Sequence, residues 1–127
     1  MVALSSVAVV EEDVDERVAL TRVLRASGFE VRSYASAEEY LASDDVEPSC
    51  LLLDMQLEGM SGLDLLRELR AGGSTLSVIF ITASDNLDSK AEAERLGCSA
   101  YLRKPFQGRA LVAILRTLVP VWRGVTH

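Results

Sequence analysis

The sequence alternates five times between a short strand-like segment and a segment with helical periodicity, and this alternation constrains the fold most. The five strand-like segments are Val7–Val10, Phe29–Tyr34, Cys50–Leu53, Leu76–Ile81 and Ser99–Leu102. Continuous apolar runs such as the first and third are typical of strands that are buried on both faces. Strands that alternate with helices over short connections predict an α/β fold, a (βα)5 doubly wound parallel sheet. Right-handed crossovers leave few topologies, and the flavodoxin-like strand order 2-1-3-4-5 is the one expected for a chain of this size.

The helices between these strands have recognisable start and stop signals. The first is expected over Arg17–Leu24, with Gly28 just beyond its end, and Gly72-Gly73 is expected to stop the third. Capping boxes are predicted at Ser36–Glu39 and at Ser61–Asp64. Asp85 is expected to cap a fourth helix that ends at Gly97.

The last predicted helix runs over Phe106–Val119 and is stopped by Pro120. Its spacing places one apolar stripe against the core and leaves two valines off that stripe, where partial exposure is expected. The stripe consists of Leu111, Ile114, Leu115 and Leu118, and the two valines are Val112 and Val119.

Length and charge favour one soluble domain without nucleic-acid or membrane partners. The chain has 127 residues, which suits a single domain over 1–127 with a core at 7–119 and a tail at 120–127. Its net charge is −6, and the basic residues of the C-terminal segment are scattered, so direct binding of nucleic acid is not expected. There is no apolar run of about 20 residues, and the apolar N-terminus lacks a basic region. With two cysteines only, a cytoplasmic location is expected.

Reactive and charged side chains stand just after the predicted strands. Three acids, Glu11, Glu12 and Asp13, follow the first strand; Asp54 follows the third, Thr82 the fourth and Lys104 the fifth. The carboxyl ends of parallel strands meet at one edge of the sheet, where functional crevices of such folds lie.

Carboxylates that converge on one crevice repel one another unless a cation neutralises them. Oxygen ligands alone favour Mg²⁺ over Zn²⁺, and a lysine and a hydroxyl suit a phosphoryl group. The set therefore predicts a phosphoryl-transfer site in which one carboxylate could act as the nucleophile.

Four segments at these positions carry a family resemblance. They are VVEED (9–13), LLLDMQLEGMSGLDLL (51–66), FITAS (80–84) and AYLRKPF (100–106). In order and spacing they resemble the signature regions of bacterial response-regulator receiver domains over residues 7–119. The resemblance implies a single-domain, chemotaxis-regulator-like signalling switch of two-component systems.

The resemblance also implies roles for individual residues. Asp54 matches the phosphoacceptor, and Thr82, Ala83 and Lys104 match residues that contact the phosphoryl group. Thr82 and Tyr101 match a switch pair, and the Lys104–Pro105 bond is expected to be cis. The implied cofactor is Mg²⁺, held by residues that include the Gln56 carbonyl. The full ligand set is Glu11, Glu12, Asp54 and Gln56.

The sequence departs from the family pattern in two places. Glu58, followed by Gly59, stands where the family commonly has proline, so the loop loses a φ restraint. Glu12 stands where an aspartate usually ligates the metal. Either Glu12 folds back to reach the metal, or Asp13 substitutes for it, or metal binding is weakened.

Other function classes fit the same residues less well. A flavodoxin-type carrier would need a phosphate-cradling first loop, which Glu11, Glu12 and Asp13 would repel, and no nucleotide-binding glycine motif occurs. A phosphohydrolase would need a second acid where Gln56 stands. The remaining rival is a pseudo-receiver that acts as an unphosphorylated interaction module.

The expected function is therefore a switch that is not an enzyme beyond catalysing its own phosphorylation and dephosphorylation. Its expected partners are a histidine kinase or phosphotransfer protein and a downstream protein effector, with a phosphorylation-dependent homodimer as a further option. With no effector domain after residue 127, output is expected through a protein contact, unless the chain is a fragment of a longer DNA-binding regulator.

Overall fold

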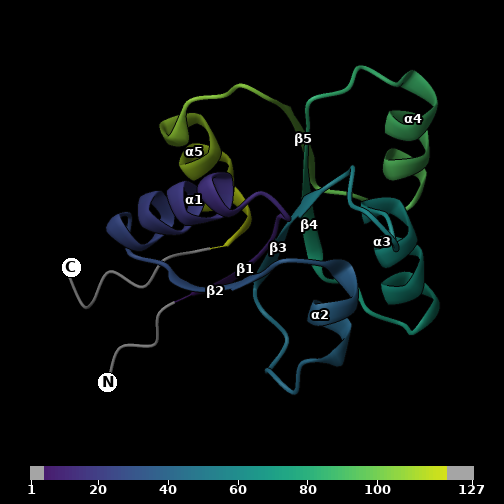
Figure 1. Cartoon of the computed structure of the whole chain (residues 1–127), viewed down its shortest axis with the longest axis horizontal. Helices are drawn as coiled ribbons and strands as arrows, with labels where there is room; N and C mark the ends of the chain where they lie inside the picture. The colour runs from purple at the N-terminus through teal and green to yellow at the C-terminus, as the bar shows by residue number, and fades with distance from the viewer. Residues whose placement is uncertain (1–4, 120–127) are drawn as a thin grey trace.

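The strands form one parallel sheet whose order is β2-β1-β3-β4-β5, as predicted (Figure 1). The structure is a computed structural model and describes residues 5–119. The strands are β1 (Ser6–Val10), β2 (Glu30–Tyr34), β3 (Cys50–Asp54), β4 (Ser77–Thr82) and β5 (Ala100–Arg103). The predicted stop at Pro120 and the tail at 120–127 lie outside the described residues.

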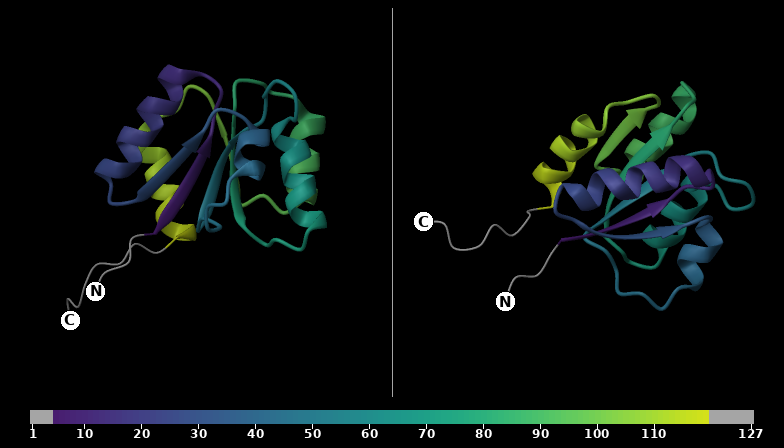
Figure 2. Two further views of the ribbon diagram at one scale, coloured as in Figure 1. Left: turned by 60° about the horizontal axis from the view of Figure 1, so that its bottom comes forward. Right: turned by 60° about the vertical axis from the view of Figure 1, so that its left-hand side comes forward.

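Helices cover both faces of the sheet, which gives three layers (Figures 1 and 2). In the described chain they are α1 (Val14–Ala26), α2 (Ala37–Ala42), α3 (Gly62–Ala71), α4 (Leu87–Arg95) and α5 (Gly108–Leu118). The helices α1 and α5 lie on one face, and α2, α3 and α4 lie on the other. None of the helices described is long and apolar enough to cross a bilayer.

The central strands contribute to both cores because their side chains alternate between the two faces. Leu51 and Leu53 of β3 face the core under α2, α3 and α4, whereas Cys50 and Leu52 face the core under α1 and α5. Every residue of β3 is buried, including Asp54 at its end. Continuous apolar runs were therefore a correct signal for doubly covered strands.

The helix ends follow the capping signals closely, except at α2 and α4. Ser61 and Asp64 form the full capping box, and Gly28 follows α1 with a φ of 97°. At α2, Ser36 caps as predicted, but the Glu39 carboxylate accepts from the Ala35 amide at 3.4 Å. The expected cap at Asp85 is wrong.

Asn86 caps α4 instead, since its side chain accepts from the Ser89 amide at 3.0 Å. Asp85 forms an ion pair with Arg103 of β5. Two adjacent residues could each have capped this helix, and the cation on the neighbouring strand is the partner that Asp85 takes.

The predicted exposure of Val112 and Val119 is also wrong, since both are buried. The stripe itself is confirmed, with Leu111 and Leu115 fully buried and Ile114 and Leu118 packed against them. The helix α5 lies against α1 as well as the sheet, and a Cβ on Gly108 would stand 2.9 Å from Cγ1 of Val23. The buried arc of α5 is therefore wider than one stripe, which the spacing alone could not show.

Candidate functional site

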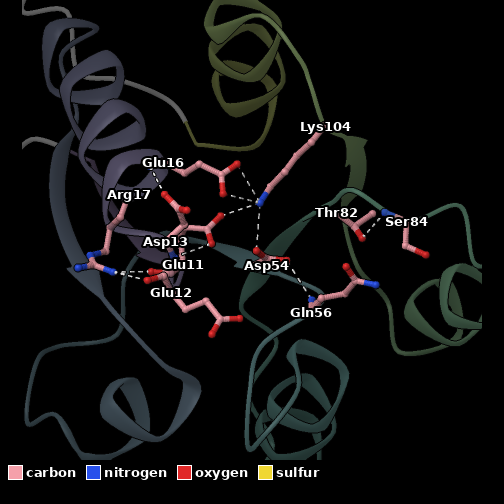
Figure 3. A network of polar contacts seen from close by, with 10 residues as sticks. All are labelled: Glu11, Glu12, Asp13, Glu16, Arg17, Asp54, Gln56, Thr82, Ser84 and Lys104. Atoms are coloured by element: carbon pink, nitrogen blue, oxygen red, sulfur yellow. Dashed lines mark hydrogen bonds and ion pairs between the residues drawn. The ribbon is translucent and has the colours of Figure 1, made fainter.

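The carboxyl ends of β1, β3, β4 and β5 bring four of the predicted residues to one edge of the sheet. Figure 3 shows Lys104 extending from the end of β5 toward Asp54 at the end of β3 and Glu11 after β1. Thr82 ends β4 and is fully buried. The backbone also ties β5 to β4 here, because the Lys104 amide donates to the Thr82 carbonyl at 2.7 Å. The Lys104–Pro105 bond is cis, as predicted.

Lys104 is the centre of the charge network. Its Nζ lies 2.7 Å from Oε1 of Glu11, 3.1 Å from Oδ2 of Asp54 and 3.3 Å from Glu16 (Figure 3). The Glu11 and Asp54 side chains are 1% and 8% exposed, whereas Glu16 is 46% exposed. One ammonium group thus bridges two buried carboxylates and a surface one.

Both Glu11 and Lys104 have raised pKa values, and in each case burial and the charged partner act in opposite directions. Burial raises the pKa of Glu11, and the nearby Asp54 adds to the rise, while the hydrogen bond from Lys104 opposes it. Burial acts to lower the pKa of Lys104, but the hydrogen bonds and charges of Glu11 and Asp54 outweigh it and raise that pKa. Lys104 therefore stays charged and neutralises part of the acidic cluster.

The two oxygens of Asp54 have different environments. Oδ1 accepts a hydrogen bond from the Gln56 amide at 2.9 Å, and Oδ2 faces Lys104. A backbone donor on one side and a cation on the other fix the orientation of the carboxylate. An oriented carboxylate at the end of a strand, where the carboxyl ends of the sheet meet, is suited to nucleophilic attack.

Thr82 and Tyr101, the predicted switch pair, lie on the α4 side of the site. The Thr82 hydroxyl oxygen accepts from the Ser84 amide at 3.1 Å, and Ala83 between them is exposed. The partly buried Tyr101 ring packs against the core, with Lys90 Nζ 5.6 Å from its centroid. Burial and the charge of Asp85 raise the pKa of Tyr101, while its contact with Thr82 acts the other way.

The three carboxylates of the acidic loop after β1 have different partners and different exposure. Glu11 is buried against Lys104. Asp13 caps α1, because its Oδ1 accepts from the Glu16 amide at 2.9 Å. Glu12 is exposed, and its side chain points away from Lys104 in Figure 3.

The chemistry of the candidate ligands fits a hard cation such as Mg²⁺, since Glu11, Glu12, Asp54 and the Gln56 carbonyl offer oxygen atoms. Within residues 5–119, however, no three Asp, Glu, His or Cys side chains are already placed around a common metal position. Lys104 occupies the space between Glu11 and Asp54. The Glu12 side chain would have to turn toward Asp54 to act as a ligand.

Two residues that contact the site were not expected from the sequence. Arg17 donates from Nη1 to the carbonyl oxygens of Glu11 at 2.7 Å and Glu12 at 3.4 Å, so α1 holds the acidic loop (Figure 3). Glu16 reaches Lys104. Asp13 and Glu16 have the spacing of a capping box, but the Glu16 carboxylate turns to the lysine, which only the packed structure could show.

Comparisons with known proteins agree with this geometry. The family model for the response regulator receiver domain matches residues 7–116. The chain is 35% identical over 109 residues to transcriptional regulatory protein FixJ of Azorhizobium caulinodans, and 40% identical over 106 residues to nodulation protein W of Bradyrhizobium diazoefficiens. A solved CheY-like receiver domain protein from Methanospirillum hungatei JF-1 superposes with a TM-score of 0.85 at 25% identity, covering 91% of this chain and 93% of that chain.

The chain belongs to the response regulator receiver domain family of two-component systems. Receiver domains are signalling modules and not enzymes in the usual sense. The matches with FixJ and nodulation protein W cover 85% and 82% of this chain, but 52% and 46% of those relatives. The chain thus spans about half the length of the curated relatives it matches.

Proposed function

We propose that the chain is a phosphorylation-dependent switch whose phosphoacceptor is Asp54. The observation that carries the proposal is the position of Lys104, whose Nζ contacts both Asp54 and the buried Glu11. A lysine held at the nucleophile can move its charge onto a phosphoryl oxygen once that group arrives. Residues 7–119 act as one receiver unit in this proposal.

The chemical step joins Asp54 to a phosphoryl group from a histidine kinase or a phosphotransfer protein. One carboxylate oxygen of Asp54 attacks phosphorus, an O–P bond forms and the P–N bond of the donor phosphohistidine breaks. The bond electrons stay on the imidazole nitrogen of the donor, which needs no proton to leave if its ring is already protonated. Hydrolysis by water reverses the modification, and the chain catalyses only these two steps on itself.

Mg²⁺ supplies charge neutralisation between the carboxylates and the incoming phosphoryl oxygens when it is bound. The proposed direct ligands are Asp54, the Gln56 carbonyl and Glu12, and Glu11 would act on the ion indirectly, through water. Asp13 is the weaker candidate because its carboxylate already caps α1. Thr82, Ala83 and Lys104 are the proposed contacts of the phosphoryl group.

The signal then leaves through a partner-binding face. We place this switch in the cytoplasm, and the two free thiols, Cys50 and Cys98, agree with that compartment. The output partner is a downstream protein or an effector domain, as the names of the transcriptional relatives suggest for those proteins.

Incubation with a small acyl phosphate and Mg²⁺ tests the phosphoacceptor directly. Intact-mass measurement is expected to show one added phosphoryl group on the wild-type chain and none on Asp54→Asn. An adduct of equal yield on Asp54→Asn would contradict the assignment. A wild-type chain that never gains the group would favour the unphosphorylated interaction module.

A further inference from the structure

The loop between β3 and α3, which follows the proposed phosphoacceptor Asp54, is held by a side chain from α2. Between β3 and α3, the Met60 amide donates to Oε2 of Glu38 at 2.9 Å. Glu38 lies in the first turn of α2, 22 residues earlier in the sequence. The bond therefore ties the loop that carries Gln56 to the neighbouring helix.

Gly59 permits this contact in two ways. Its φ is +72°, in the left-handed region that favours glycine. A Cβ at this position would also lie 2.5 Å from Oε2 of Glu38. The carboxylate can approach the Met60 amide only because residue 59 has no side chain.

The rest of the loop is anchored at its two ends. The Gln56 amide donates to Asp54 at 2.9 Å, and the Gly62 amide donates to the Met55 carbonyl at 3.1 Å. In the middle, the Glu58 amide makes no hydrogen bond to any described residue, and Glu58 lacks the φ restraint that a proline would impose. Glu38 supplies the side-chain restraint at the middle of the loop.

We infer that Glu38 is a positioning residue that holds the β3–α3 loop in the geometry needed by Asp54 and the Gln56 carbonyl. This inference rests on the proposed function, because it assigns the loop a role in phosphorylation and Mg²⁺ binding. The helix that carries Glu38 is itself fixed to the sheet, since the Tyr40 and Tyr34 rings stack edge to face 5.2 Å apart. The bond from Met60 also lowers the pKa of Glu38, so the charged carboxylate is the form that holds the loop.

The variants Glu38→Ala and Glu38→Gln test the clamp, with Glu39→Ala as the matched control. Glu39 is the next residue in the same helix and is also exposed, so its loss changes the charge in the same way. Amide exchange at Met60, measured without metal or phosphoryl donor, is expected to speed up about fivefold in Glu38→Ala, the worth of one exposed charge-assisted hydrogen bond. Glu38→Gln keeps an acceptor oxygen but loses the charge, so its exchange rate is expected to lie between those of wild type and Glu38→Ala, whereas Glu39→Ala is expected to exchange at the wild-type rate.

The second measurement is the Mg²⁺ concentration that half-saturates phosphorylation by a small acyl phosphate. It is expected to rise about fivefold in Glu38→Ala and to stay near wild type in Glu39→Ala. Adding Glu58→Pro to Glu38→Ala restores a backbone restraint without removing a hydrogen bond, so it is expected to recover most of the loss.

Wild-type exchange at Met60 in Glu38→Ala would overturn the inference. A wild-type chain that gains no phosphoryl group would instead overturn the proposed function. The exchange at Met60 would still decide whether the clamp exists. The two failures are therefore distinguishable.

Discussion

At the scale of single residues, the site depends on how one lysine and several carboxylates share charge. Lys104 offsets part of the charge of Glu11 and Asp54, which are too buried for solvent to screen them well. Glu16, by contrast, contacts the same lysine from the surface, where an ion pair contributes little. The contacts of Lys104 with Glu11 and Asp54 are therefore the ones expected to matter most.

The adjacent acids Glu12 and Asp13 are expected to respond differently to removal. Asp13→Ala removes the N-cap of α1 and should cost about 1 kcal/mol in the free energy of unfolding, with little change in Mg²⁺ affinity. Glu12→Ala should weaken Mg²⁺ binding clearly, and Glu12→Asp should tighten it or leave it unchanged. Urea unfolding and Mg²⁺ titration of the three variants measure both effects. The reverse pattern, with Mg²⁺ binding lost in Asp13→Ala alone, would move the metal site by one residue.

At the scale of elements, the packing of α1 against α5 shows how a helix end can depend on the neighbouring helix. Gly108 begins α5 at a point where Val23 of α1 leaves no room for a Cβ. Valine in a helix has one strongly preferred rotamer and cannot easily turn aside. The glycine is therefore required by the contact between the helices, although glycine disfavours helices.

Gly108→Ala is expected to destabilise the fold by about 1 kcal/mol, even though alanine has the higher helix propensity. The added Cβ would stand 2.9 Å from Cγ1 of Val23, so one of the two helices must shift. Val23→Ala in the same chain should relieve the clash, so that the double variant loses less than the two single losses together. Additive losses in thermal or urea unfolding would show that the two positions do not compete for space.

At the scale of the whole molecule, the site is connected to the face formed by α4, β5 and α5. Thr82 and Lys104 share a backbone hydrogen bond, and Tyr101 of β5 lies between Thr82 and Lys90 of α4. The ion pair between Asp85 and Arg103 joins the loop before α4 to β5 in the same region. A change in the rotamer of Thr82 can thus reach residues on two neighbouring elements.

A dianion on Asp54 would give the Thr82 hydroxyl a strong acceptor, and we expect the threonine to turn inward and Tyr101 to follow. Phosphorylated protein should then show altered amide exchange on α4, β5 and α5, and Thr82→Ala should lose this change while still accepting the phosphoryl group. Sedimentation of the same samples tests whether this face also forms a homodimer. Altered exchange confined to the surroundings of Asp54 would contradict this route.

Much of the fold was predictable from the sequence because its signals are local. The buried strand before Asp54, the capping box at Ser61 and the glycine after α1 each depend on residues that are close in the chain. The alternation of elements and the right-handedness of crossovers left few topologies, and the order usual for a chain of this size is the one observed. The convergence of Glu11, Asp54, Thr82 and Lys104 followed in turn, because parallel strands end at the same edge.

Only the tertiary structure decided the contacts between residues that are far apart in the chain. No local pattern indicates that Glu38 reaches Met60, that Glu16 reaches Lys104, or that Val112 is buried in the core under α1 and α5. Nor does a local pattern indicate that Asn86 caps α4 while Asp85 pairs with Arg103, a cation on another strand. The physical reason is that side-chain periodicity and capping are short-range properties, whereas these partners are chosen by how closely the packed elements approach one another.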